Sequence, residues 1–136
     1  MSSCIPEGFQ DLLEKPINAA FVTLMPDGSP HVSVVWYLWE EPYISISTSP
    51  SSRKGRNIAR DRRVALVLND TDDKYRYLGV QGVVEAIKHD PEGTFADRLW
   101  SFYEGRTMYN GQVPPEEQEH LYVYRIRPLS FVSYGE

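Results

Sequence analysis

An Asp-Gly turn between two β-prone runs is the feature that most restricts what this chain can fold into. The runs occupy residues 19–25 and 31–38, and the segment PDGSP at 26–30 separates them. Asp-Gly between such runs is a strong signal of a β-hairpin, because glycine adopts positive φ angles without steric strain. A second turn at 40–42 leads to 43–48, where residue character alternates with period two. The sequence therefore predicts three successive antiparallel strands.

Helix and strand signals continue through the rest of the chain. Ser-Pro-Ser-Ser at 49–52 interrupts the third strand and supplies a cap for a helix. In chain order, we expect a short amphipathic segment at 9–13, a helix at 53–61, a buried strand at 64–68, one bent strand or two at 75–88, a helix that 90–92 caps and Gly105 ends, and two last strands at 121–126 and 129–134 with Pro128 between them.

The number and order of these elements indicate the fold class. Six or seven antiparallel strands with two to four short helices make a small α+β domain that is mainly β. A closed or nearly closed barrel is the most economical arrangement, because closure removes exposed strand edges. We expect one domain over residues 1–136, because the chain has the length of one domain and no repeat, low-complexity tract or long linker divides it.

Composition excludes several classes of protein. Hydrophobic residues make up 41% and charged residues 24%, unlike a disordered chain, and no apolar run reaches the roughly 20 residues of a membrane span. The N-terminus lacks the pattern of a secretory signal and Cys4 is the only cysteine, so we expect a cytoplasmic protein without an internal disulfide. His31, His89 and His120 lie far apart and have no thiol or carboxylate at ligand spacing, so no metal site is expected.

Positive charge is concentrated in one short segment. Residues 53–63 hold six of the fourteen basic residues and one acid, whereas the remaining chain carries eight basic and eighteen acidic residues. This distribution suits a small polyanion better than a nucleic-acid backbone, and it disfavours an OB-like barrel that binds single strands. A solvated helix face with extra arginines is the alternative that composition leaves open.

The start of this basic segment has the residue types of a phosphate site. Ser52 caps the expected helix, and Arg53 and Lys54 follow it directly. A helix N-terminus offers unpaired backbone N–H groups, a guanidinium binds two phosphate oxygens and a lysine adds a point charge. Asn57 lies one turn further on and can donate from the same side. Serine caps before basic helices also occur without any ligand, so this alternative stays open.

Aromatic residues are too many for the interior of one small barrel. Trp36, Tyr37 and Trp39 are expected on one strand, and Tyr122 and Tyr124 on another. Part of this aromatic surface must face a ligand or a second subunit, and we therefore expect a homodimer.

The order of the motifs resembles the pyridoxamine 5'-phosphate oxidase-like split β-barrel proteins. The resemblance is carried by PDGSP at 26–30, the strand at 31–37, the segment Thr48-x-x-x-Ser52-Arg53-Lys54-Gly55 and the segment Asp61-x-x-Val64-Ala65-Leu66. It covers residues 17–88 well. Within this family the chain is most similar to the short branch that uses the deazaflavin coenzyme F-420.

The resemblance implies a split β-barrel with a cofactor at a dimer interface. It implies a phosphate held by Ser52, Arg53, Lys54 and Asn57, a ring along Val35, Trp36, Ser47 and Thr48, and contacts from Arg76 and Tyr77 of a second subunit. Tyr77 stands where the oxidase has a glutamine. The C-terminus at 131–136 lacks the tryptophan and arginine that hold pyridoxamine phosphate in the oxidase, so this substrate is not expected.

The arginines after Lys54 favour F-420 over FMN as the cofactor. F-420 extends beyond its phosphate into a tail with several negative charges, and Arg56 and Arg60 lie four residues apart on one helix face. Both arginines could instead pair with surface carboxylates. The resulting hypothesis is a reductase that transfers a hydride from reduced F-420 to a conjugated or electron-poor small molecule.

We expect the pocket of this reductase to be walled by Trp36, Trp39 and a second subunit, and no catalytic side chain is assigned. The alternatives are an FMN-dependent oxidoreductase of the same family and a non-catalytic carrier of flavin, deazaflavin or haem, since hydride transfer requires no catalytic side chain from the protein.

Overall fold

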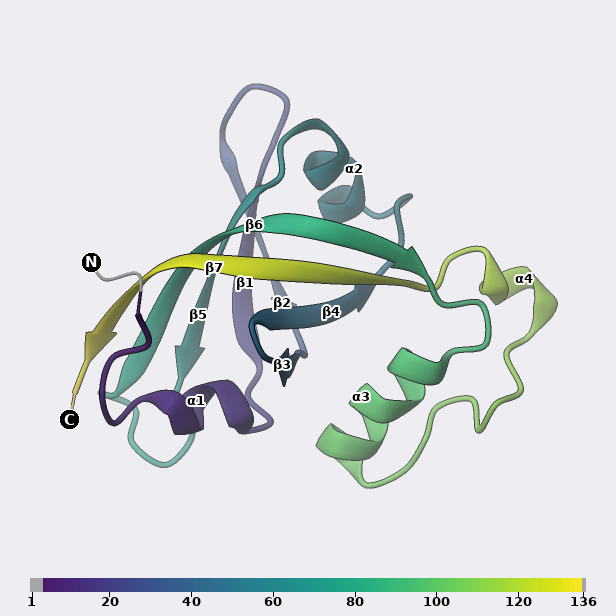
Figure 1. Cartoon of the computed structure of the whole chain (residues 1–136). Helices are drawn as coiled ribbons and strands as arrows, with labels where there is room; N and C mark the ends of the chain where they lie inside the picture. Colours follow the sequence, from purple (N-terminus) through teal and green to yellow (C-terminus); the bar gives the residue numbers. More distant parts are fainter. Residues whose placement is uncertain (1–3, 136) are drawn as a thin grey trace.

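A seven-stranded antiparallel sheet forms the body of the protein in the computed structural model, which describes residues 4–135 (Figure 1). The order across the sheet is β2-β1-β5-β6-β7-β4-β3. The strands are β1 (Ala19–Leu24), β2 (Pro30–Val35), β3 (Leu38–Glu40), β4 (Tyr43–Thr48), β5 (Arg63–Asn69), β6 (Tyr77–His89) and β7 (Tyr122–Tyr134). The predicted class, α+β and mainly β, is confirmed.

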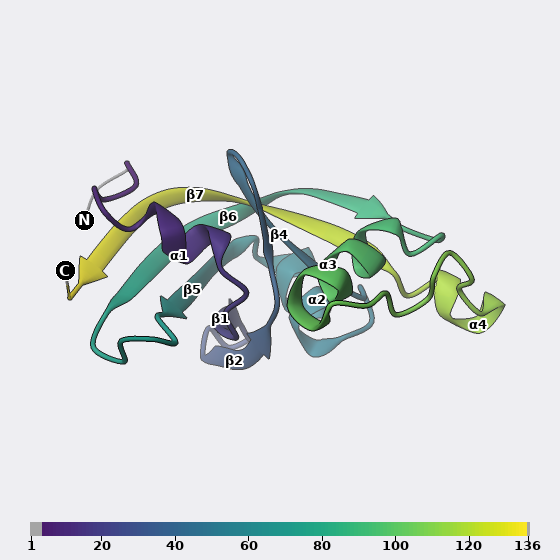
Figure 2. The same ribbon diagram turned by 90° about the horizontal axis from the view of Figure 1, so that it is seen from below.

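The sheet curls into a barrel that hydrogen bonds do not close. β2 and β3 lie at opposite edges of the sheet, yet only Trp36 and Tyr37 separate them in the chain. Two residues span only a few ångströms, so the sheet must curve until its two edges approach each other. Figure 2 shows this curvature in β6 and β7. The expected split β-barrel is confirmed, and within residues 4–135 its edge strands β2 and β3 do not pair.

The break between β2 and β3 corrects one predicted element. The run at 31–38 was expected to form one strand, but β2 ends at Val35 and β3 begins at Leu38. Tyr37 turns into the core, where its side chain is fully buried and its hydroxyl donates to the Leu12 carbonyl at 2.7 Å. Trp36 and Trp39 consequently do not share a strand.

The long strands β6 and β7 bend together at two register shifts. The shifts fall between Gln81 and Gly82 and between Val84 and Ala86, so the expected bent strand is confirmed. A Cβ atom on Gly82 would lie 2.8 Å from the Arg127 carbonyl oxygen, and only glycine fits there. Pro128 pairs with Gly82 at this irregularity, where a strand tolerates a residue without an N–H donor. The prediction of two final strands is therefore wrong, because β7 continues through Pro128.

Within residues 4–135, four helices lie around the barrel: α1 (Gln10–Glu14), α2 (Arg53–Arg60), α3 (Thr94–Glu104) and α4 (Pro115–Gln118). In Figure 1, α2 lies near the β1–β2 hairpin, whereas α3 and α4 extend to one side of the sheet. The end of α3 at Gly105 is confirmed, and the cap at its other end is Gly93, at φ 68°. No helix within residues 4–135 is long and apolar enough to cross a bilayer.

Two hydrophobic clusters hold these elements together. The larger cluster fills the barrel, and α1 contributes Leu12 and Leu13 to it. The smaller one consists of Phe95 and Leu99 of α3 with Val123 of β7, and it packs against Trp36, Leu38 and Tyr103. Because this second cluster is small, α3 is attached to the sheet mainly through side chains around Trp36.

Candidate functional site

The N-terminus of α2 is built by a serine cap. Ser52 Oγ accepts the Gly55 N–H at 3.0 Å and donates to the Ser49 carbonyl at 2.7 Å. Thr48 Oγ1 lies 3.1 Å from the same Ser52 oxygen, which links the end of β4 to the helix. The predicted cap is confirmed, and the Ser52 hydroxyl is thereby fully engaged within the protein.

Gly55 allows the preceding turn to pack directly on α2. A Cβ atom at this position would lie 2.1 Å from the Ser49 carbonyl oxygen and 2.8 Å from Pro50 Cα. Both are backbone atoms, so they cannot move aside like the end of a flexible side chain. The glycine after Ser52-Arg53-Lys54 is therefore required by the close approach of the turn.

Two cations lie at this helix N-terminus without an acidic partner. Arg53 and Lys54 are half-buried, and no carboxylate within residues 4–135 forms an ion pair with either side chain. Their backbone N–H groups have no backbone acceptor in the same part of the chain, since the first bonded N–H of the helix is that of Gly55. Free donors and unpaired cations at a helix N-terminus make a site for an anion.

Asn57 and Arg60 turn away from this anion site. Asn57 is fully buried and its amide donates to Thr23 Oγ1 of β1 at 3.0 Å. This differs from the expectation that Asn57 donates to a phosphate, because the contact with β1 determines where the amide points. Arg60 donates to the Leu24 carbonyl, whereas Arg56 is exposed and has no ion pair among the described residues.

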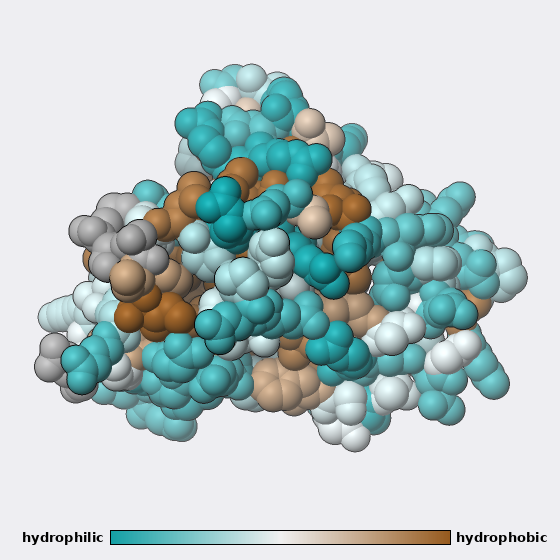
Figure 3. Space-filling view, viewed as in Figure 1, coloured by the Kyte–Doolittle hydropathy of each residue, from teal (hydrophilic) through white to brown (hydrophobic). Residues whose placement is uncertain are grey.

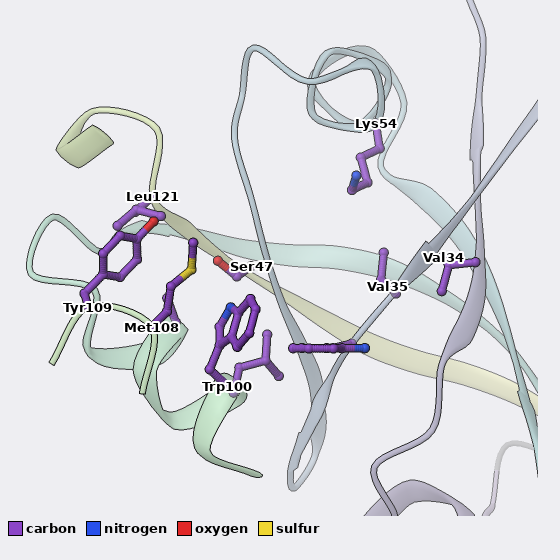
Figure 4. Close-up of a pocket in the computed structure, with 11 residues that line it drawn as sticks. Val34, Val35, Ser47, Lys54, Trp100, Met108, Tyr109 and Leu121 are labelled. Atoms are coloured by element: carbon purple, nitrogen blue, oxygen red, sulfur yellow. The ribbon is translucent and has the colours of Figure 1, made fainter. Parts of the chain in front are cut away.

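A cavity of about 290 Å³ opens beside Lys54 (Figure 4). It brings together four of the predicted residues: Val35, Trp36, Ser47 and Lys54. Thr48 is the next residue after Ser47 on β4. The wall opposite these residues comes from α3, from the loop after it and from the residue that precedes β7, and its residues are Ala96, Leu99, Trp100, Met108, Tyr109 and Leu121.

Trp36 is held firmly in this cavity. Its indole stacks on Tyr103 with ring centroids 4.6 Å apart, and Trp100 meets it edge-on at 5.1 Å. Trp36 Nε1 donates to Asn18 Oδ1 at 2.8 Å. The Tyr103 hydroxyl donates to the Ile17 carbonyl at 2.8 Å, and burial raises the pKa of this phenol to about 12. Tyr103, Trp100 and Asn18 therefore fix the orientation of the indole before any ligand binds.

The α3 wall is the part of the site that the sequence interpretation missed. Ala96, Leu99 and Trp100 follow helical spacing, and a tryptophan on such a face was the available signal. Trp39 was expected in the wall instead, and this expectation is wrong. Trp39 lies on β3 and lines a separate cavity together with Ile5.

Arg76 and Tyr77 lie outside this cavity. The Arg76 guanidinium donates to Asp11, to Asp70 and to the Gly8 carbonyl, and its side chain is 13% exposed. Because Asp11 belongs to α1 and Asp70 to the β5–β6 loop, Arg76 attaches these two segments to each other. This structural role was not apparent from the sequence. The Tyr77 ring lies 5.7 Å from that of Tyr134, and Tyr77 is not among the residues that line this cavity.

No three His, Cys, Asp or Glu residues in the described range 4–135 lie close enough together to hold a metal ion. The residues that line the cavity give it an apolar, aromatic character with the Lys54 ammonium at one end. Such a cavity can hold a planar ring whose charged group reaches the N-terminus of α2.

Comparisons with known proteins agree with this arrangement. The family model for pyridoxamine 5'-phosphate oxidase matches residues 5–131. Among curated proteins, none is similar enough in sequence to match.

Solved structures provide several matches. An F-420 reductase superposes with a TM-score of 0.85 at 34% identity, over 94% of this chain and 98% of that one. A conserved hypothetical protein from Mycobacterium tuberculosis has a TM-score of 0.74 at 26% identity, over 98% and 88%. General Stress Protein 26 from Bacillus anthracis has the same fold, with a TM-score of 0.69 at 18% identity, over 93% and 90%. The chain therefore belongs to the pyridoxamine 5'-phosphate oxidase-like family, in the branch that includes the F-420 reductase.

Proposed function

We propose that this protein is an F-420-dependent reductase that acts on a conjugated or electron-poor small molecule. The observation that carries the proposal is that Lys54 lines an aromatic cavity and, like its neighbour Arg53 at the N-terminus of α2, has no acidic partner within residues 4–135. The similarity to a structure named as an F-420 reductase supports the same cofactor. An oxidoreductase of the flavin or deazaflavin type is the coarser conclusion, and it agrees with the family.

The residues present fit such a cofactor. Arg53, Lys54 and the free N–H groups of α2 would bind its phosphate, while Val35, Trp36, Ser47 and Thr48 would lie along the ring. When bound, reduced F-420 supplies a hydride to the acceptor. Trp36 would orient the ring, and Trp100 on the facing wall would help to exclude water, which favours direct transfer. Ser52 contributes through the helix cap rather than through its own hydroxyl.

Arg56 favours F-420 over FMN. Its side chain is exposed, lies two residues beyond Lys54 and has no carboxylate partner within residues 4–135. A charged tail that continues past the phosphate would pass this guanidinium, whereas FMN ends at its phosphate. Arg60 does not contribute to this preference, because its guanidinium donates to the Leu24 carbonyl.

We also propose that two copies of the chain form a dimer that completes the site. The outer face of β1 and β2 carries apolar residues, and Val32 and Val34 are 63% and 68% exposed. Val34 also lines the cavity, so a partner covering this face would reach the ring site. Leu129 and Val132 of β7 are further exposed apolar side chains. Figure 3 shows apolar patches among hydrophilic residues on the face of the molecule seen in Figure 1. A second copy would bring its own Tyr77 toward the cavity.

Titration with F-420, followed by deazaflavin fluorescence, tests the proposal. Lys54→Ala should weaken binding about 10- to 100-fold, because it removes a charge-assisted contact worth about 1.5–3 kcal/mol. Lys54→Arg keeps the charge and serves as the matched control, with binding expected within a few-fold of the wild type. Micromolar FMN binding without any F-420 binding would contradict the choice of cofactor.

Turnover separates a reductase from a carrier. The loaded protein should reduce at least one member of a panel of enones, quinones and tetrapyrroles. Tight F-420 binding with no turnover on the whole panel would favour the non-catalytic carrier.

A further inference from the structure

The loop between α3 and α4 is held in place by one carboxylate. This loop, residues 106–112, contains no helix or strand, and Asn110 and Gly111 both have positive φ angles, of 52° and 76°. Asp97 in the first turn of α3 accepts the Tyr109 N–H at 2.7 Å with Oδ1 and the Gly111 N–H at 3.1 Å with Oδ2. The two oxygens thus bind the residues on either side of Asn110.

Contacts of the loop side chains depend on this arrangement. The Tyr109 ring packs across Gly93, where a Cβ atom would lie 3.0 Å from the ring, and its hydroxyl lies 3.1 Å from Glu117. Arg106 covers the Trp100 ring, with 5.6 Å between its guanidinium carbon and the ring centroid. The loop is therefore bound to α3 at its start, in its middle and near its end.

The loop places Met108 and Tyr109 on the cavity. Figure 4 shows both side chains beside Trp100, on the side of the cavity away from Val34 and Val35. Met108 is 49% exposed, so it lies at the opening and has room to adjust to a ligand. A thioether beside an indole offers a polarisable, apolar surface that suits a flat conjugated ring.

We infer that Met108 determines which planar acceptors enter the cavity and that Asp97 is the positioning residue that holds Met108 there. This inference rests on the proposed function, because it assigns the α3 side of the cavity to the acceptor. Asp97 itself touches no ligand in this scheme. The cofactor's phosphate lies at α2, on the other side of the cavity, so a change at Asp97 should alter acceptor binding and leave cofactor binding unchanged.

Binding of menadione, a planar naphthoquinone, tests this without the cofactor. Quenching of tryptophan emission reports binding, because Trp36 and Trp100 line the cavity. Asp97→Ala and Met108→Ala should each raise the menadione Kd about tenfold, the change that about 1.4 kcal/mol produces. Asp27→Ala is the matched control, since Asp27 also accepts a backbone N–H, from Ser29, but in the β1–β2 turn.

The loaded enzyme gives the second measurement. In both variants the KM for menadione should rise about tenfold while kcat stays within about twofold and the F-420 Kd is unchanged. Amide exchange at Tyr109 and Gly111 should accelerate in Asp97→Ala and stay slow in Asp27→Ala. Met108 is largely exposed, so its truncation tests the inference even if Asp97→Ala does not fold.

Three results would overturn the inference: no menadione binding by the wild type, an unchanged Kd in Met108→Ala, or an unchanged Kd in folded Asp97→Ala. Failure of the wild type to bind F-420 would instead refute the proposed cofactor, and the quenching titration would still decide the role of the loop.

Discussion

Substitution of Gly55 by alanine tests whether the close contact between α2 and the preceding turn shapes the anion site. Alanine normally stabilises a helix relative to glycine by about 1 kcal/mol. Here the added methyl group would lie 2.1 Å from the Ser49 carbonyl oxygen. A normal contact needs more than about 3 Å, so the turn must move by about 1 Å, and such overpacking costs about 1–3 kcal/mol.

The net effect of Gly55→Ala should be a loss of up to about 2 kcal/mol in the free energy of unfolding and a fall in Tm of up to about 8 °C. Movement of the turn also displaces Ser52, whose hydroxyl caps the helix, so F-420 binding should weaken more than stability alone explains. Thermal unfolding followed by circular dichroism and F-420 titration measure the two effects.

Ala59→Gly is the control for helix propensity. Ala59 is exposed on the same helix, so this change should lower stability by about 0.5–1 kcal/mol and leave F-420 binding intact. A Gly55→Ala protein that is as stable as the wild type and binds F-420 equally well would refute the reasoning.

Two further predictions concern stability. Asp11 has its pKa lowered to about 2, chiefly by its hydrogen bond from Arg76. A carboxylate whose pKa is lowered on folding stabilises the fold above its unfolded pKa of 3.8, and this contribution is lost as the pH falls from about 4 to 2. The free energy of unfolding, measured with urea at pH 6, 4 and 3, should therefore decline with pH, and Asp11→Asn should reduce this decline. Tyr103→Phe removes the hydroxyl that donates to Ile17 and accepts from the Tyr37 N–H, and it should lower the free energy of unfolding by about 1–3 kcal/mol. Unchanged urea midpoints in Tyr103→Phe would contradict that estimate.

Local parts of the molecule were predictable because neighbouring residues determine them. The β1–β2 hairpin follows from Asp27-Gly28, and Gly28 has a φ of 87° as such a turn requires. The cap of α2 by Ser52 involves residues only three positions apart. The bend of β6 was visible from its glycines, although the pairing of Pro128 with Gly82 was not, since it joins two distant segments.

The candidate site was predictable only on the side that the Ser52-Arg53-Lys54 segment forms. Trp36 and Lys54 could be chosen from motifs. Their partners Trp100 and Met108 could not, because no local rule relates the β2–β3 connection and α2 to α3 and the loop after it.

The sequence by itself determined the β1–β2 hairpin, the helix cap and the pair of cations at the N-terminus of α2, because these depend on interactions within a few residues. Only the tertiary structure decided which way each polar side chain points. Asn57 turns to Thr23, 34 positions away, and Arg76 turns to Asp11, 65 positions away. Both residues were expected at the cofactor, and both instead bind acceptors that folding brings to them, because a buried donor is stabilised by the nearest acceptor in space rather than in sequence.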